Sequence, residues 1–174
     1  PLLIKYDSAG KVLWARKITD GSSDYCYAIC IDRAQNVCVT GIESGHVISA
    51  FTAKYDGNGN LVWINESRGE DCITYTRGIV TDRVGNIYVA GDCKGVVDID
   101  NFTIGTPSKY TVFLIKYDVK GRVLWVKQSA PSDNYYTQAR SLAIDPQEHI
   151  YLAGEFHDEL HMGNAKVNGK GEQD

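Results

Sequence analysis

Few side-chain patterns in this sequence suggest chemistry, and the most enzyme-like is a pair of histidines. His157 and His161 are four residues apart, the spacing with which two histidines on a helix hold zinc in metalloproteases. The glutamate that would follow the first histidine is absent, and the surrounding residues predict a strand. Positions four apart on a strand are separated by about 13 Å, too far for one zinc ion without other ligands. We therefore expect no metal site and no cofactor.

A second pattern resembles the opening of a calcium-binding loop. Residues 56–60 read DGNGN, but the glycine required at the sixth position of such a loop is replaced by Leu61, and the glutamate at the twelfth is missing. Gly and Asn also tolerate the positive φ angles of tight turns. A hairpin turn is the simpler interpretation.

The five cysteines give little support for covalent catalysis. Because their number is odd, at least one is unpaired within the chain. Cys30 and Cys38 flank a predicted turn and should face each other across two strands, near enough for a disulfide. Buried thiols are the more economical interpretation, because the corresponding positions in the rest of the chain hold ordinary apolar residues. No Gly-x-Ser-x-Gly motif is present, and we expect no enzymatic activity.

Three polar segments are better candidates for function. Segments 19–27, 67–77 and 129–140 concentrate Ser, Asp, Asn, Tyr and Arg, which is typical of adaptable recognition surfaces for a protein or glycan ligand. The alternative is that the arginines only pair with the nearby aspartates and hold the loops. The candidate ligand-binding residues are Tyr27, Arg77, Arg140, Asp24, Asp71, Asp133, Tyr75, Tyr135 and Tyr136.

These segments recur because the whole chain is repetitive. Lys-Tyr-Asp occurs at residues 5–7, 54–56 and 116–118, and in each copy a Trp follows seven residues after the Asp. A second landmark, an aspartate, a turn and an apolar run ending in Gly, keeps the same register. The repeats are 1–49, 50–111 and 112–174, so the length equals three whole repeats. Because the Trp recurs at one repeat position, we expect it to pack between repeats.

Each repeat predicts four short antiparallel strands. The runs are four to seven residues long, rich in β-branched and aromatic residues and separated by turn chemistry. Four-stranded repeats of about 40 to 50 residues are typical of β-propeller blades. The segment GIVTDRVGNIYVAG (78–91), together with FLIKYD (113–118), resembles the bacterial SBBP β-propeller repeat family. The resemblance implies an all-β propeller fold and an extracellular or bacterial cell-surface location.

The composition and the phase of the repeats limit the classes of partner that we expect for this chain. The 18 Lys and Arg against 22 Asp and Glu give a formal charge of −4, which argues against nucleic acid, and no apolar run is long enough to span a membrane. The family resemblance implies that the chain begins with two outer strands and ends with two inner ones. Since three repeats cannot close a propeller alone, we expect either a partial propeller continued by further repeats of a longer chain, or a homodimer closing a six-bladed ring.

The sequence therefore favours a non-enzymatic binding or scaffold module that presents a polar, Tyr-rich loop face. Two alternatives remain open. One is a polysaccharide-acting lyase or hydrolase with its site at the mouth of the central channel, and the other is a purely structural spacer in a large bacterial surface protein.

Overall fold

The computed structural model of the chain describes residues 1–20, 23–135, 137–157 and 159–169. Within these ranges the regular structure is entirely β, so none of these residues forms a helix that could cross a membrane. The strands of the first half are β1 (Leu2–Tyr6), β2 (Val12–Lys17), β3 (Tyr25–Ile31), β4 (Val37–Ser44), β5 (Ile48–Tyr55), β6 (Leu61–Glu66) and β7 (Ile73–Thr81). Those of the second half are β8 (Ile87–Ile99), β9 (Phe102–Tyr117), β10 (Val123–Gln128), β11 (Gln138–Ile144), β12 (Ile150–Glu155), β13 (Glu159–Met162) and β14 (Ala165–Asn168).

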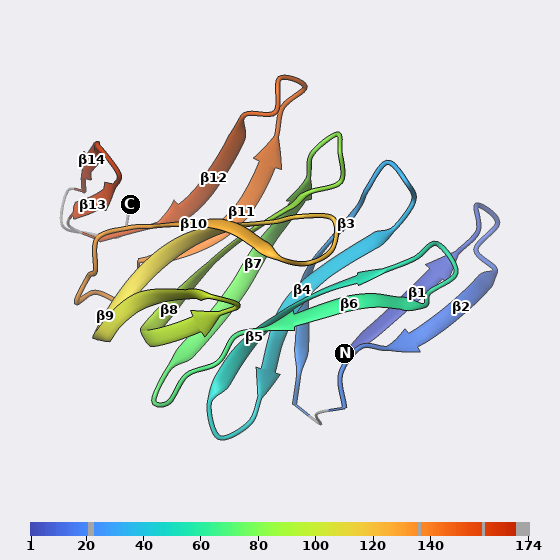
Figure 1. Ribbon diagram of the computed structural model, residues 1–174, viewed down its shortest axis with the longest axis horizontal. Helices are drawn as coiled ribbons and strands as arrows, with labels where there is room; N and C mark the ends of the chain where they lie inside the picture. The colour runs from blue at the N-terminus through green and yellow to red at the C-terminus, as the bar shows by residue number, and fades with distance from the viewer. Residues whose placement is uncertain (21–22, 136, 158, 170–174) are drawn as a thin grey trace.

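The strands form two complete four-stranded antiparallel units, which Figure 1 shows side by side. We call β3–β6 unit A and β7–β10 unit B. Within each unit every strand pairs with the next one along the chain, and a single parallel pair, Ile48 with Ile73, joins the two units. The pairs β1–β2 and β11–β12 stand before and after them. This arrangement confirms the predicted all-β strand pattern.

The first strands of successive units lie next to one another. In Figure 1, β3, β7 and β11 follow in order across the molecule. The Thr81 hydroxyl on β7 reaches the Ile31 carbonyl on β3 at 3.5 Å. On the other side, a Cβ added to Gly78 would lie 2.8 Å from the backbone nitrogen of Leu142 on β11. We call these three strands the inner strands, and they bring equivalent positions of the three repeats together.

Aspartates fix the turns between strands. In the turn after β5, Asp56 accepts hydrogen bonds from the backbone N–H groups of Asn58 and Asn60, each at 2.9 Å. Its other oxygen accepts from the Asn60 side chain at 2.9 Å. Asp82 makes the same bonds in the turn after β7. The DGNGN segment is therefore a hairpin turn whose carboxylate is already used by the chain.

Two of the three tryptophans pack on the unit that follows them, as predicted. The Trp63 ring of unit A donates its indole N–H to the Val119 carbonyl in the β9–β10 turn of unit B, at 3.2 Å. A Cβ on Gly121 of that turn would lie 2.6 Å from the ring, and Gly121 has a φ of +85°. Trp14 packs in the same way on Gly59. Glycine is needed here both for the backbone angle and for the close approach of the ring.

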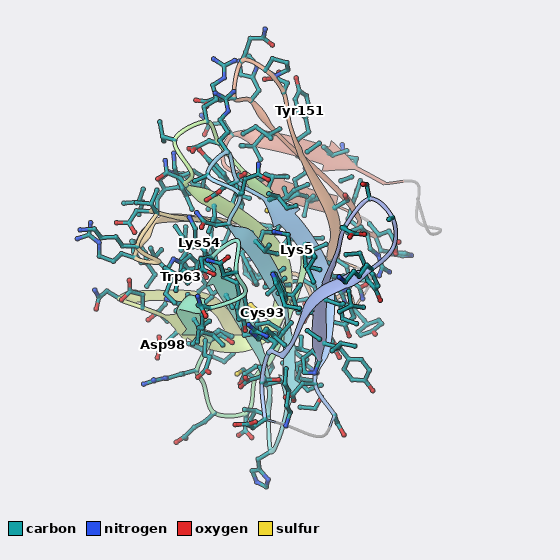
Figure 2. All side chains as sticks on the ribbon, turned by 90° about the vertical axis from the view of Figure 1, so that its right-hand side faces the viewer. Lys5, Lys54, Trp63, Cys93, Asp98 and Tyr151 are labelled. Carbon is teal, nitrogen blue, oxygen red and sulfur yellow. The ribbon has the colours of Figure 1, made fainter. Side chains whose placement is uncertain are left out.

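Buried ion pairs tie the inner turns to the third strand of each unit. The Lys54 ammonium lies 2.9 Å from Asp32, and both side chains are about 95% buried. Lys116 and Asp82 form the equivalent pair in unit B at 3.5 Å. In the last repeat, Asp145 instead binds His149 and the Tyr151 hydroxyl. Figure 2 shows Tyr151 near one end of the molecule, away from Lys54.

Candidate functional site

The candidate site is built on a β-bulge that occurs at the same place in all three inner strands. The pairing register shifts between Cys26 and Ala28 on β3, between Thr76 and Gly78 on β7, and between Ala139 and Ser141 on β11. The extra residues at these shifts are Tyr27, Arg77 and Arg140. A bulge re-aims its side chain and is enriched beside functional sites. The prediction that these three residues share one repeat position is therefore confirmed at the level of backbone geometry.

In unit B the bulge arginine pairs with a buried carboxylate. The Arg77 guanidinium contacts Asp92, which lies on the neighbouring strand β8, and only 7% of the Asp92 side chain is exposed. Burial raises the Asp92 pKa to about 6, although Arg77 acts in the opposite direction. The Ala139 backbone N–H on β11 also donates to Asp92. This carboxylate thus links unit B to the next inner strand.

The last repeat contains the equivalent pair in a more open setting. The Arg140 guanidinium donates two parallel hydrogen bonds to Glu155, at 2.9 and 3.0 Å. About half of each side chain is exposed. The bond from Arg140 holds the Glu155 pKa below its usual range. Asp92 and Glu155 therefore occupy one repeat position but have opposite pKa shifts, because one is buried and the other is not.

Tyrosines surround these pairs. The Tyr75 ring lies under Arg77, with the guanidinium carbon 4.6 Å from the ring centroid. Burial raises the Tyr75 pKa, and so do its neighbours Tyr27 and Tyr135, which places the three tyrosines of three repeats in one electrostatic neighbourhood. Tyr27 is 45% exposed and Tyr135 is 58% exposed. About half of each residue is therefore accessible to a ligand, although each ring also packs on a neighbouring tyrosine.

A small pocket of about 50 Å³ opens between the tyrosines. Tyr110 and Tyr135 meet edge to face with centroids 5.6 Å apart, and the Lys94 ammonium lies 5.3 Å from the Tyr110 centroid. The residues that line the pocket are Ile73, Tyr75, Asp92, Lys94, Tyr110, Tyr135 and Gln138. Aromatic faces beside a few polar groups are the usual lining of a binding pocket, but ligand pockets measure roughly 300–1,000 Å³, so this hollow is large enough only for a small group of a ligand bound on the surface.

The structure places the predicted aspartates outside the two arginine pairs. Asp24 accepts hydrogen bonds from the Thr19 hydroxyl at 2.5 Å and from the Ser44 backbone N–H at 2.9 Å. Asp133 pairs with Lys109, and Asp71 stands in a left-handed backbone conformation with a φ of 50°. The arginines thus find their carboxylates on the adjacent strand and not in the loops. Tyr136 lies outside the described residues.

Sequence reasoning missed Asp92 and Glu155, although a signal for them was present. Each directly follows the glycine of the second repeat landmark, and each stands fifteen residues after its bulge arginine. In the first repeat the same position is Ile42, and the bulge residue is Tyr27 instead of Arg. Carboxylate and arginine therefore change together from repeat to repeat, which identifies them as a pair.

The other candidate residues have structural surroundings. His161 lies on β13 and its ring contacts Glu159, as the prediction of a strand required. Cys30 and Cys38 are direct cross-strand partners, as predicted, and both are free thiols. Their mutual contact and burial raise the Cys30 pKa. Among the described residues, no three His, Cys, Asp or Glu side chains are arranged to hold a metal ion.

The strand pattern and the repeated inner-strand bulge define an all-β repeat protein, and comparison with known proteins specifies its class. Residues 73–95 match the beta-propeller repeat family SBBP, so the chain carries a repeat of that family. The chain is also similar to an uncharacterized WD repeat-containing protein of Acanthamoeba polyphaga mimivirus. The alignment is 200 residues long with its gaps, shows 29% identity and covers 88% of this chain. It spans only 14% of that relative's length.

Proposed function

We propose that this chain is a non-enzymatic binding module of a β-propeller, with its ligand site at the bulge ends of the inner strands. The observation that supports it most is the repetition of the bulge. Tyr27, Arg77 and Arg140 occupy one position on three adjacent strands, and a position shared by three repeats faces one common region. Propellers build their ligand sites where such equivalent positions surround the channel.

The chemistry of the site favours a protein or glycan ligand. Both arginines are already neutralised by carboxylates, so the surface provides fixed hydrogen-bonding groups without excess positive charge. Exposed tyrosine rings supply contact area at a low entropic cost. A neutral or weakly charged ligand with many hydroxyl or amide groups fits this combination better than a phosphate group.

The rest of the propeller is part of the proposal. We infer that the strands before and after units A and B are completed by further repeats of a longer chain, with a second copy of this chain as the alternative. The great length of the WD repeat-containing relative supports the first arrangement. An extracellular or bacterial cell-surface location is inferred from the SBBP resemblance.

An array experiment tests the binding site. The chain, labelled with a fluorophore at its N-terminus, is applied to glycan and peptide arrays beside Tyr27→Ala and Arg140→Ala. Both residues are exposed, so the variants should fold. Arg33→Ala is the matched control, because Arg33 is an exposed arginine at the opposite end of the inner strands. We expect the two site variants to lose a shared set of array signals that Arg33→Ala retains. Signals that survive in both site variants would refute the proposed site.

One observation favours a second candidate, an acid–base enzyme acting on polysaccharides. Asp92, with a pKa of about 6, and the ionised Glu155 are carboxylates whose surroundings move their pKa values apart, as in enzymes with separate acid and base groups. Reducing-sugar release or unsaturated-sugar absorbance on a polysaccharide panel tests this. Turnover that disappears in Asp92→Asn would establish the enzyme, and no turnover by the folded chain would leave the binding module.

A further inference from the structure

A second surface is a groove between the loop that follows β2 and unit A. The groove measures about 600 Å³. Its lining includes the apolar side chains of Ile18, Val47, Leu61 and Ile64 and the carboxylates of Asp20, Asp24, Glu43 and Glu66. The sequence did not predict a groove here.

The groove exists because unit A has a shorter hairpin than unit B. The β4–β5 hairpin of unit A turns at residues 45–47, whereas β8 and β9 of unit B continue through Gly95–Thr106 as paired strands. The two repeats differ accordingly in length, 49 against 62 residues. We call residues 95–106 the added hairpin.

In unit B the added hairpin covers β10. Its side chains Val97, Ile99 and Ile104 are at most 2% exposed and belong to the main core. Asp100 at its tip accepts a hydrogen bond from the Val123 backbone N–H at 3.1 Å, and the Gly105 N–H donates to the Gln128 side chain at 2.9 Å.

A backbone bridge fixes the other side of the added hairpin. Arg68 and Asp98 exchange two hydrogen bonds of 2.8 and 2.7 Å. The added hairpin therefore fills the space between the loop that follows β6 of unit A and the face of β10 in unit B.

The equivalent residues of unit A are uncovered. Leu61 stands where unit B has Val123, and the exposed fraction rises from 9% for Val123 to 51% for Leu61. Ile64, which matches the core-packed Val126, is 36% exposed. The first unit thus presents the surface that its neighbour buries under two strands.

The charges in the groove of unit A also differ from those in unit B. Glu43 stands where unit B has the buried Cys93, and Glu66 where it has Gln128. Burial raises the Glu43 pKa, and the nearby Glu66 and Asp24 raise it further. The carboxylates repel one another, so a cation placed between them would relieve that repulsion.

We propose that this groove binds an extended segment of a partner protein that places alternating apolar side chains on Leu61 and Ile64 and Lys or Arg beside Glu43 and Glu66. The added hairpin of unit B is the internal template for the occupant, because it lies on the equivalent surface with alternating Val and Ile side chains. The acidic walls set the charge of the occupant.

A peptide made from the template tests this proposal. The probe is the fluorescein-labelled peptide of residues 96–104 with Asp98→Lys and Asp100→Lys, and the reference is the same peptide unaltered. Fluorescence anisotropy against the full 174-residue chain should show the basic peptide binding at least about tenfold tighter than the acidic one, with an affinity that falls as salt rises.

Variants of the chain separate the groove from general charge effects. Glu66→Gln installs the residue that unit B has, and with Glu43→Gln it should weaken binding of the basic peptide about tenfold. Glu70→Gln removes the same charge from an exposed loop position outside the groove and should change nothing. Equal affinity of the two peptides, no binding of the basic peptide, or an equal loss in Glu70→Gln would each overturn the proposal.

Discussion

The contrast between Asp92 and Glu155 gives a quantitative prediction. Burial raises the Asp92 pKa from 3.8 to about 6, so the folded chain holds a proton on this group at pH values where the unfolded chain has released it. The stabilisation from this group is therefore complete below pH 3.8 and is lost as the pH rises to 6. At about 1.36 kcal/mol per pH unit, the loss amounts to about 3 kcal/mol.

The test is a pair of stability profiles. Urea unfolding free energies are measured from pH 3.5 to pH 7.5 for the wild type and for Asp92→Asn, and the difference between the two profiles isolates Asp92. We expect the variant to gain about 3 kcal/mol relative to the wild type as the pH rises through this range.

Glu155 provides the control of opposite sign. Its pKa is lowered by the bond from Arg140, so its contribution to stability is present above the unfolded pKa and lost as the pH falls. Glu155→Gln should therefore gain stability relative to the wild type on acidification, the reverse of Asp92→Asn. A flat difference profile for Asp92→Asn, or the same sign for both variants, would refute the assignment of a buried and an exposed carboxylate to the two pairs.

Two further predictions concern the framework. Gly121→Ala should destabilise the chain by about 2–4 kcal/mol in the urea assay, because the added Cβ clashes with a tryptophan ring and alanine disfavours the positive φ. Gly10 is the equivalent position, with a positive φ but open space around it. Gly10→Ala should therefore cost only about 1 kcal/mol. Asp32→Asn should cost about 3–5 kcal/mol because it leaves Lys54 buried without its partner. Thermal unfolding measures this loss, with Asp145→Asn, which breaks an exposed pair, as the control. An equal loss of stability in the two variants would contradict the prediction.

Much of the architecture could be predicted from the sequence because the repeat fixes it. Lys-Tyr-Asp and the following tryptophan recur in phase, so the strand order, the turns and the packing of Trp63 on the next unit follow from aligning the chain with itself. The alignment also placed Tyr27, Arg77 and Arg140 at one position. The bulge that orients these side chains was not predictable, because a local change in strand register has no characteristic residue composition.

The partners of the arginines were harder to predict. Acidic residues in the loops are close to Arg77 in the sequence, but Asp92 is close in space because antiparallel pairing places β8 beside β7. The groove was missed for a different reason. The short first hairpin is visible in the sequence, but what it uncovers depends on how the longer hairpin packs on Val123 and Gln128.

The central claim, a ligand site formed by the bulges of three repeats, is tested most directly by locating a bound ligand. The strongest array ligand is titrated into chain labelled with ¹³C on the tyrosine rings, and the ring resonances are followed by NMR. The account predicts shifts for Tyr27, Tyr75 and Tyr135, with the buried Tyr55 and Tyr117 unchanged. Saturating binding that leaves the first three resonances in place would contradict it.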